Sequence, residues 1–299
     1  MSTLTSRIHP LNHFPTEGVS CYVKRDDELS CGISGSKYRK YTSLMPYLMQ
    51  QGIKHLLIIA GPQSNNLLAA LQMAREFNLE VHAFLLKPWS ALNQGNFKLS
   101  RLFLKDDEIT WINRNEWPKV EEYAVAHQHT LTTPSFILTE GASVTAAKEG
   151  AMTLATDIYQ NEAQLGFTFD HLFVDTGTGF TAAALIKGLK DNAHPGHIHV
   201  LLLADKEKEF KEKMLNWYGE LPSNYSCFYP TTAKAFGSFN QNINNEIHRL
   251  AREEGILADP IYAAKLFYEA RKRIHNEHLK GKVLIIHSGG TLTMPNFSY

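Results

Sequence analysis

Residues 171–190 read HLFVDTGTGFTAAALIKGLK, a short apolar run followed by a glycine-rich turn and an alanine-rich segment. An apolar run of this length bounded by turn residues is typical of a buried strand, and the segment after it favours a helix. A second stretch, HLLIIAGPQSNNLLAALQMAREFNL at 55–79, repeats the order of strand, turn and helix. Strands that alternate with helices predict an α/β fold with mainly parallel sheets covered on both faces.

Further strands are expected at four more apolar runs, 81–86, 107–112, 197–204 and 282–290. In parallel α/β sheets, ligands bind beyond the carboxyl ends of the strands, so the residues just after each strand are candidates for function. Three loops lie at such ends, namely GPQSNN at 61–66, TGTGFT at 176–181 and HSGGT at 287–291.

Composition and charge exclude several classes of partner. Thirty basic residues balance thirty acidic ones among 299, so no field of one sign favours nucleic acid or an anionic membrane. No apolar run approaches the ~20 residues of a spanning helix, and the first residues lack the apolar core of a signal peptide, so we expect a cytoplasmic protein. The three cysteines lack metal-type spacing and the histidines lack the spacing of a helical zinc site, so no metal is expected.

The TGTGFT loop has the properties of a phosphate-binding turn. Gly177 and Gly179 permit unusual backbone angles, and the N-terminus of the following helix adds about half a positive charge. Ala182 stands where a dinucleotide fingerprint needs its third glycine, and the Lys-Ser/Thr pair of a Walker A loop is missing. A turn that only caps the helix is the alternative.

The GPQSNN loop places neutral polar side chains at another helix start. The amides and hydroxyl of residues 63–66 suit a carboxylate or phenolate oxygen better than a cation. The alternative is a simple helix cap formed by Ser64 or Asn65.

The stretch GISGSKYRKY at 32–41 brings Lys37 to the start of a helix. The helix dipole and neighbouring cations lower the pKa of a lysine there, as an amine that forms a Schiff base near neutral pH requires. Arg39 is interpreted as structural, paired with an acid of the RDDE stretch at 25–28. The amine, the phosphate loop, the polar pocket and the hydroxyl of HSGGT match the aldehyde, phosphate, phenolate and ring nitrogen of pyridoxal 5'-phosphate.

Four blocks of the chain, in order, resemble one family of pyridoxal-phosphate enzymes of fold type II, that of 1-aminocyclopropane-1-carboxylate deaminase and D-cysteine desulfhydrase. The blocks are KRDDELSCGISGSKYRKYTSLMPYL (24–48), AGPQSNNLLAALQMAREFNLEVHAFL (60–85), EGILADPIYAAKLFYEARKRI (254–274) and VLIIHSGGT (283–291). The resemblance implies a fold like that of the tryptophan synthase β-subunit, with two parallel-sheet α/β domains. It implies a large cofactor-binding domain of residues 1–40 and 140–299, a small domain of 41–139, and a homodimer.

The resemblance also implies which residues hold the cofactor. They are Lys37, Lys40, Asn65, Gly177, Thr178, Gly179, Phe180, Thr181 and Ser288. Lys37 would form the Schiff base, Lys40 would reach the phosphate, and Asn65 would bind the 3′-oxygen. Ser288 would meet the ring nitrogen as a neutral hydroxyl, which leaves that nitrogen unprotonated and the ring a weaker electron sink.

The implied catalytic residues are Lys37, Ser64 and Tyr262, with Lys37 shuttling protons. The implied substrate contacts are Gln63, Ser64, Asn65, Asn66 and Tyr262. The leading hypothesis is a lyase or deaminase of a small amino acid. It resembles D-cysteine desulfhydrase and releases a 2-oxo acid and ammonia by β-elimination, with sulfide as well when the substrate is cysteine.

Two departures from the family pattern bear on the substrate. Asn66 follows the QSN triplet where desulfhydrases usually carry His and deaminases Gln, and Ile285 stands where deaminases carry a second tyrosine. The second departure disfavours opening of a cyclopropane ring, so 1-aminocyclopropane-1-carboxylate deaminase is the alternative activity. Two more hypotheses stay open, a catalytically degenerate pyridoxal-phosphate binder and a sugar-phosphate or nucleotide binder. The last would leave Lys37 and the QSN triplet unexplained.

Overall fold

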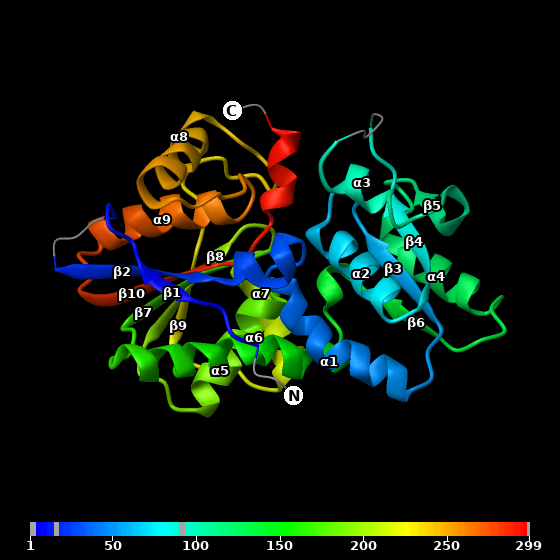
Figure 1. The fold of residues 1–299 in the computed structure, drawn as a ribbon, viewed down its shortest axis with the longest axis horizontal. Coiled ribbons are helices and arrows are strands. Elements are labelled where there is room, and N and C mark those ends of the chain that lie inside the picture. Colours follow the sequence, from blue (N-terminus) through cyan, green and yellow to red (C-terminus); the bar gives the residue numbers. More distant parts are fainter. Residues whose placement is uncertain (1–3, 15–17, 90–93, 298–299) are drawn as a thin grey trace. The chain divides into compact units, whose positions relative to one another are not determined.

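The computed structural model describes residues 4–14, 18–89 and 94–297 (Figure 1). The chain divides into two compact units. Of the described residues, those up to Arg39 and from Ala151 to Met294 make up the larger unit, and those from Lys40 to Gly150, together with 295–297, make up the smaller one. Both are α/β units with mostly parallel sheets, as the alternation of strands and helices predicts.

In the described part of the larger unit, six strands form one sheet in the order β1-β2-β10-β7-β8-β9. Their bounds are Ile8–Pro10 (β1), Val19–Arg25 (β2), His171–Thr176 (β7), His197–Leu202 (β8), Tyr225–Phe228 (β9) and Gly281–His287 (β10). β1 pairs antiparallel with β2, and the remaining neighbours pair in parallel. The carboxyl ends of β10 and β7 therefore meet at the same edge of the sheet.

Helices cover both faces of this sheet (Figure 1). They are α5 (Lys148–Leu165), α6 (Phe180–Asp191), α7 (Glu207–Tyr218), α8 (Gln241–Arg249) and α9 (Ala263–Asn276). Side chains of β7 alternate between the two faces, since Phe173 packs with Phe267 of α9 whereas Val174 packs with Leu185 of α6. This alternation places a fully buried strand at the centre of the unit.

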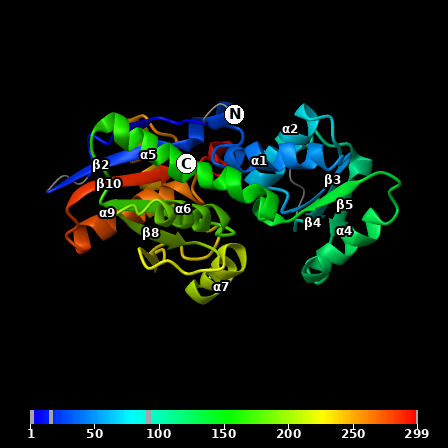
Figure 2. The ribbon, with the colours of Figure 1, turned by 90° about the horizontal axis from the view of Figure 1, so that it is seen from below.

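In the described part of the smaller unit, four parallel strands follow the order β5-β4-β3-β6. They are β3 (His55–Ala60), β4 (Glu80–Leu86), β5 (Ile109–Ile112) and β6 (Ser135–Leu138). The helices are α1 (Lys37–Gln50), α2 (Asn65–Glu76), α3 (Gly95–Ser100) and α4 (Val120–Gln128). The first three residues of α1 belong to the larger unit. Figure 2 shows α1 and α2 over one face of this sheet and α4 over the other.

The two units differ from the predicted domains at Lys40 and at residues 140–150, all of which group with the smaller unit. Hydrogen bonds within that unit explain the difference. The Ser43 hydroxyl donates to the Ala146 carbonyl at 2.7 Å and accepts from the Gly150 N–H at 2.9 Å. These contacts join α1 to a segment about a hundred residues away, which no local sequence pattern reveals.

Arg39 has the structural role that the sequence predicts. Its guanidinium donates to both carboxylate oxygens of Asp26 at 2.7 Å and to Asp157 at 2.5 Å. Lys24 Nζ donates to the same oxygen of Asp157 at 2.5 Å. All four side chains lie within the larger unit and are at most 1% exposed. We refer to them as the paired cluster.

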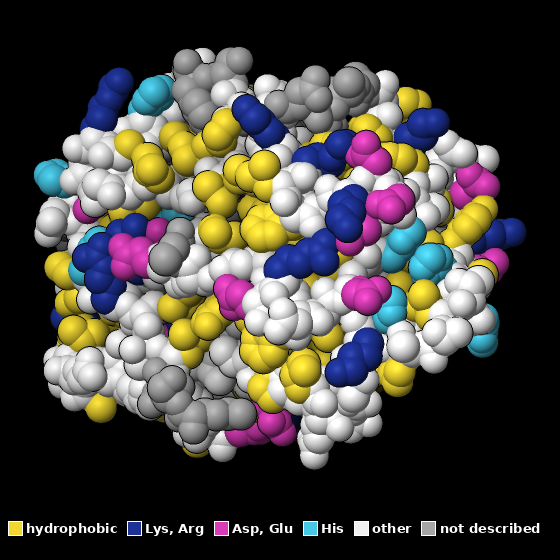
Figure 3. Space-filling model, turned by 45° about the vertical axis from the view of Figure 1, so that its right-hand side comes forward, with side chains coloured by type: hydrophobic (Ala, Val, Ile, Leu, Met, Phe, Trp, Pro, Cys, Tyr) yellow, Lys and Arg dark blue, Asp and Glu magenta, His cyan; other side chains and the backbone are white. Residues whose placement is uncertain are grey.

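The surface agrees with the balanced composition. Basic and acidic side chains are interspersed on the face shown in Figure 3. Among the described residues, no helix is both long and apolar enough to cross a membrane.

Candidate active site

The loop before α1 packs directly on the loop after β10. The Ser36 N–H donates to the Ser288 carbonyl at 2.9 Å. Gly35 has φ +52°, and a Cβ there would lie 2.5 Å from the same carbonyl oxygen and 3.0 Å from Gly289 Cα. Only glycine allows this approach of two backbones. The contact holds Lys37 beside the carboxyl end of β10.

Lys37 begins α1, and its side chain is half-buried. Burial lowers the pKa of its amine, while the negative charges of Asp175 and Asp259 oppose the shift. The direction agrees with the prediction, but the cause differs. Burial rather than neighbouring cations dominates, because the guanidinium of Arg39 is neutralised by Asp26. A lysine of this kind can react as a neutral amine.

Asp175, which the sequence analysis missed, is close enough for its charge to act on this amine. Its Oδ1 accepts the Ser288 hydroxyl at 3.2 Å, and the residue is 8% exposed. Burial raises the pKa of the Asp175 carboxyl to about 6, although the charge of Lys37 lowers it. The sequence carries a signal for it, since Asp175 is the one charged residue in the run HLFVDT before GTG.

Asp259 positions Tyr262, one of the predicted catalytic residues. The Asp259 carboxylate accepts the N–H groups of Ile261, Tyr262 and Ala263 at 2.9, 2.9 and 3.0 Å. It thereby caps the first N–H groups of α9 (Ala263–Asn276) and of the turn before it. The phenol of Tyr262 lies beside the TGTG loop, because a Cβ added at Gly177 would come within 3.1 Å of Tyr262 Oη. Asp259 is the second functional residue that sequence reasoning missed, although it stands in the matched DPIY block.

The N-terminus of α6 has no side-chain cap. Gly179 occupies the N-cap position with φ +86° and offers no side-chain oxygen to the first amides of the helix. Phe180 is predicted to bind the cofactor, but its ring is fully buried and packs edge-on against Trp217, so only its backbone N–H suits a ligand. An uncapped helix start with a glycine turn is suited to an anion.

These groups of the larger unit fit pyridoxal phosphate. Lys37 offers an amine for the aldehyde, the start of α6 offers amides for the phosphate, and Ser288 offers a hydroxyl for the ring nitrogen. Gly177 leaves room beside Tyr262 that any side chain would fill. The larger unit thus holds Lys37, Tyr262, Ser288 and the loop 177–181, and their roles toward the cofactor stay predictions.

In the smaller unit, the alternative interpretation of Ser64 as a helix cap is confirmed. Ser64 Oγ accepts the N–H groups of Asn66 and Leu67 at 3.1 and 3.4 Å at the start of α2. Asn65 Oδ1 accepts the side-chain amide of Asn96 at 2.7 Å. A hydroxyl that accepts two N–H groups still has its own O–H to donate, so the cap and a role toward a ligand are compatible.

Gln63 and Asn66 are held inside the smaller unit. Gln63 accepts the Phe97 N–H at 3.2 Å and donates to the Gln94 carbonyl at 3.1 Å. Asn66 is 1% exposed, and its Oδ1 accepts the hydroxyl of Tyr41 at 3.1 Å. The structure therefore gives Asn66 a packing role that its place after the QSN triplet does not reveal.

Lys40 also contacts its own unit. Its Nζ donates to the carbonyl of Gly141 at 2.6 Å. The role of Lys40 toward a phosphate stays a prediction from the resemblance.

Ile285 lies in the core of the larger unit. It is fully buried on β10, where it pairs with Val23 and Phe173. The residue at this position contributes to the packing of the core against which Tyr262 also lies.

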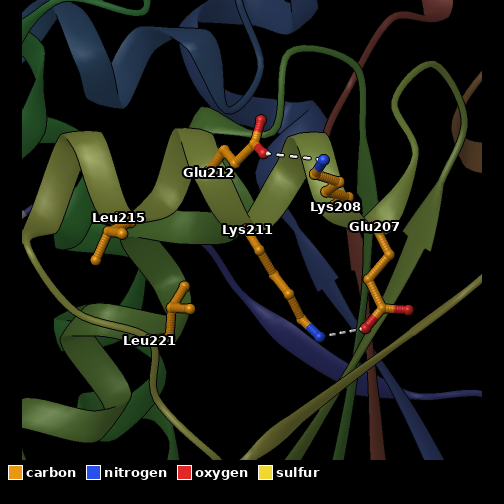
Figure 4. A pocket seen from close by; sticks show the side chains of 6 residues that line it. All are labelled: Glu207, Lys208, Lys211, Glu212, Leu215 and Leu221. Atoms are coloured by element: carbon orange, nitrogen blue, oxygen red, sulfur yellow. Dashed lines mark ion pairs between the residues drawn. The ribbon is translucent and has the colours of Figure 1, made fainter.

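A hollow on the outer surface of α7 lies apart from these residues (Figure 4). Its lining residues are Glu207, Lys208, Lys211, Glu212, Leu215 and Leu221. Lys211 pairs with Glu207 at 2.6 Å, and the side chain of Lys208 is 87% exposed. The hollow lies on a solvated, charged face of α7, and none of the predicted site residues lines it.

Comparisons with known proteins agree with the resemblance. No family model matches the chain. The chain is 26% identical over 307 residues to the 1-aminocyclopropane-1-carboxylate deaminase of Variovorax paradoxus, covering 94% of this chain and 89% of that protein. The crystal structure of an ACC deaminase homologue superposes with a TM-score of 0.84 at 20% identity, covering 98% of this chain and 91% of the other.

A solved pyridoxal 5'-phosphate-dependent aspartate racemase has the same fold, with a TM-score of 0.68 at 13% identity and coverage of 96% and 90%. The expected fold, that of the type II pyridoxal-phosphate enzymes, is therefore confirmed, as is the resemblance to the deaminase family.

Proposed function

We propose that this protein is a pyridoxal-phosphate-dependent lyase that releases a 2-oxo acid and ammonia from a small amino acid. One observation carries the proposal. In one unit, a half-buried lysine with a lowered pKa lies beside a serine–aspartate pair, and the phenol of Tyr262 lies beside a glycine loop at an uncapped helix start. The similarity to a protein named as a deaminase over most of both chains supports it.

When bound, pyridoxal phosphate supplies the electron sink that accepts the electron pair left when the Cα–H bond breaks. The start of α6 would hold its phosphate with the amides of residues 177–181, and Ser288 would face its ring nitrogen. Contributions of Lys40, Asn65, Gln63, Ser64 and Asn66 from the smaller unit stay predictions from the resemblance, as do a homodimer and the cytoplasm.

The residues of the larger unit supply the proton transfers. Lys37 Nζ, whose pKa is lowered by burial, would provide the covalent attachment and then take the proton from Cα. Tyr262 Oη donates a proton to the departing β-substituent. Asp259 orients Tyr262 because its carboxylate accepts the backbone N–H of that residue and of both neighbours.

Two substrate classes compete within this proposal. Departure of a β-substituent, as from D-cysteine, needs only a base for Cα and an acid for the leaving group, which Lys37 and Tyr262 provide. The named relative favours 1-aminocyclopropane-1-carboxylate instead, whereas Ile285, which stands where deaminases carry a second tyrosine, disfavours it. Release of 2-oxo acid from D-cysteine, L-cysteine, D-serine and 1-aminocyclopropane-1-carboxylate distinguishes these classes.

The first experiment measures the yellow absorption band of the protein supplied with pyridoxal phosphate. We expect the band in the wild type and in Lys208→Ala, whose lysine is exposed on α7, and its loss in Lys37→Ala. A protein that stays colourless would contradict the proposal. A band without oxo acid from any of the four amino acids would instead favour a degenerate cofactor binder.

A further inference from the structure

The hydroxyl proton of Ser288 is already used in a hydrogen bond. The hydroxyl donates to Asp175 Oδ1 at 3.2 Å, across the ends of the neighbouring parallel strands β10 and β7. A serine hydroxyl has one proton and two lone pairs. Once its proton points to Asp175, the oxygen can only accept from any further partner.

A pyridine nitrogen offers either a lone pair or, when protonated, an N–H. An oxygen that can only accept matches the protonated form. This differs from the expectation for a lone neutral hydroxyl, which could donate to the lone pair and leave the nitrogen unprotonated. The carboxylate behind the serine therefore changes which form of the ring the site favours.

The charged groups around Asp175 also favour a protonated ring nitrogen. They come from Lys37 on α1, Asp259 before α9 and His287 at the end of β10. His287 Nε2 contacts the Leu257 carbonyl at 2.8 Å, and its Nδ1 accepts the Gly289 N–H at 3.2 Å. Two carboxyl groups thus face one amine, so a positive ring nitrogen would be stabilised there.

We propose that Asp175, acting through the hydroxyl of Ser288, keeps the ring nitrogen of bound pyridoxal phosphate protonated. The inference rests on the proposed function and makes Asp175 a positioning residue. The chain Asp175–Ser288–nitrogen holds two protons in either arrangement. With Asp175 ionised, the nitrogen carries one and the serine the other, and with Asp175 protonated, each hydroxyl donates to the next atom and the nitrogen carries none. A protonated ring is the stronger electron sink.

The test uses pyridoxal phosphate labelled with ¹⁵N in the ring and bound to the full-length protein. We expect the ¹⁵N resonance of the wild type at the position of a protonated pyridine. In Asp175→Asn, which keeps the shape and an acceptor oxygen but not the charge, it should move to the unprotonated position. Ser288→Ala should show the same shift, and Ser288→Thr, which restores the hydroxyl, should return the wild-type resonance.

A kinetic readout accompanies the spectrum. Exchange of the Cα hydrogen of alanine, which lacks a leaving group, with solvent deuterium should slow by about ten- to hundredfold in Asp175→Asn. Asp191→Asn at the end of α6 removes one carboxylate paired with Lys187 outside the site, and should leave both readouts unchanged.

The outcomes separate the two proposals. An unprotonated resonance in the wild type, or a protonated one in both Asp175→Asn and Ser288→Ala, overturns the role of Asp175 and leaves the proposed function standing. Failure of the wild type to bind the labelled cofactor overturns both.

Discussion

Two clusters of buried charged groups lie in the larger unit, and only Tyr38 separates Arg39 of one from Lys37 of the other. In the paired cluster, the cations of Lys24 and Arg39 bond directly to the carboxylates of Asp26 and Asp157 at 2.5–2.7 Å. In the second, which we call the site cluster, Asp175 and Asp259 are held by a serine hydroxyl and by backbone N–H groups.

The difference decides which groups can titrate. Burial favours the neutral form of Asp26, but the Arg39 guanidinium holds its pKa below the ordinary value. Burial raises the pKa of Asp175 to about 6, because the charge of Lys37 offsets it only in part. A direct ion pair keeps both of its groups charged, and such a pair serves the structure. A buried carboxyl group without a direct ionic partner has a pKa nearer to neutral pH and can exchange a proton.

The largest effect is expected on activity when Lys37 is removed. Lys37→Ala should lower oxo-acid release by about a thousandfold or more, because the amine is both attachment point and base. Since burial disfavours the charged amine, the free energy of unfolding should not fall. Activity assays and denaturant unfolding, with Lys208→Ala as the control, measure both. Full activity in Lys37→Ala would exclude the assignment.

Breaking the paired cluster should affect stability most. Arg39→Met leaves Asp26 and Asp157 without their guanidinium and should lower the free energy of unfolding by about 3–5 kcal/mol. The control is Arg7→Met, which breaks an exposed pair with Glu28 and should cost less than about 1 kcal/mol. Equal costs in urea unfolding would mean that burial does not distinguish the two pairs.

In the site cluster, removal of a charged group should raise the free energy of unfolding, and the gain should depend on pH. The pKa of Asp175 is higher in the folded protein, about 6 against an ordinary value of 3.8, so ionisation costs stability as the pH rises through this window. Asp175→Asn should therefore raise the free energy of unfolding by up to about 3 kcal/mol at pH 7. Below about pH 4, where the carboxyl is protonated in both states, the variant should be as stable as the wild type. Asp26 contributes in the reverse sense, since its lowered pKa adds stability that is lost in acid. Unfolding at several pH values checks this, and a benefit that grows in acid would contradict it.

The smallest effect is expected at the glycine that joins the loops. Gly35→Ala should cost about 2 kcal/mol, because an alanine at φ +52° is strained and its Cβ would press on the Ser288 carbonyl. It should also weaken the yellow band by displacing Lys37. Gly52→Ala has a similar φ of +66° but open space around it, so it should show the strain without the loss of the band. Matching losses of the band in both variants would argue against the loop contact.

Much of the fold could be predicted from apolar runs. Six of the ten strands among the described residues lie where such runs predict them, including β3, β7 and β10. β2 was not expected because VSCYVKR mixes polar and apolar residues, and SFIL of β6 is too short to distinguish. The segment 140–150 could not be assigned because the bonds from Ser43 that hold it span about a hundred residues.

Site residues could be predicted where a glycine turn follows a strand. They could not be predicted where a residue's role depends on its burial in the fold. The glycine turn at Gly177 was expected from its own residues, whereas Tyr262 was named only through the resemblance to the family. Asp175 could not be assigned a role, because a single acid at a strand end gives no information on whether the fold buries it. The pKa of Lys37 was predicted in direction only, since its main cause is desolvation.

The central claim is that Lys37 forms the covalent link to the cofactor, and one measurement tests it directly. The protein loaded with pyridoxal phosphate is reduced with borohydride, digested, and its peptides are weighed by mass spectrometry. We predict that the reduced pyridoxyl group is attached to Lys37. Attachment to Lys40 or any other lysine, or no attached group in a protein that shows the yellow band, would contradict the account.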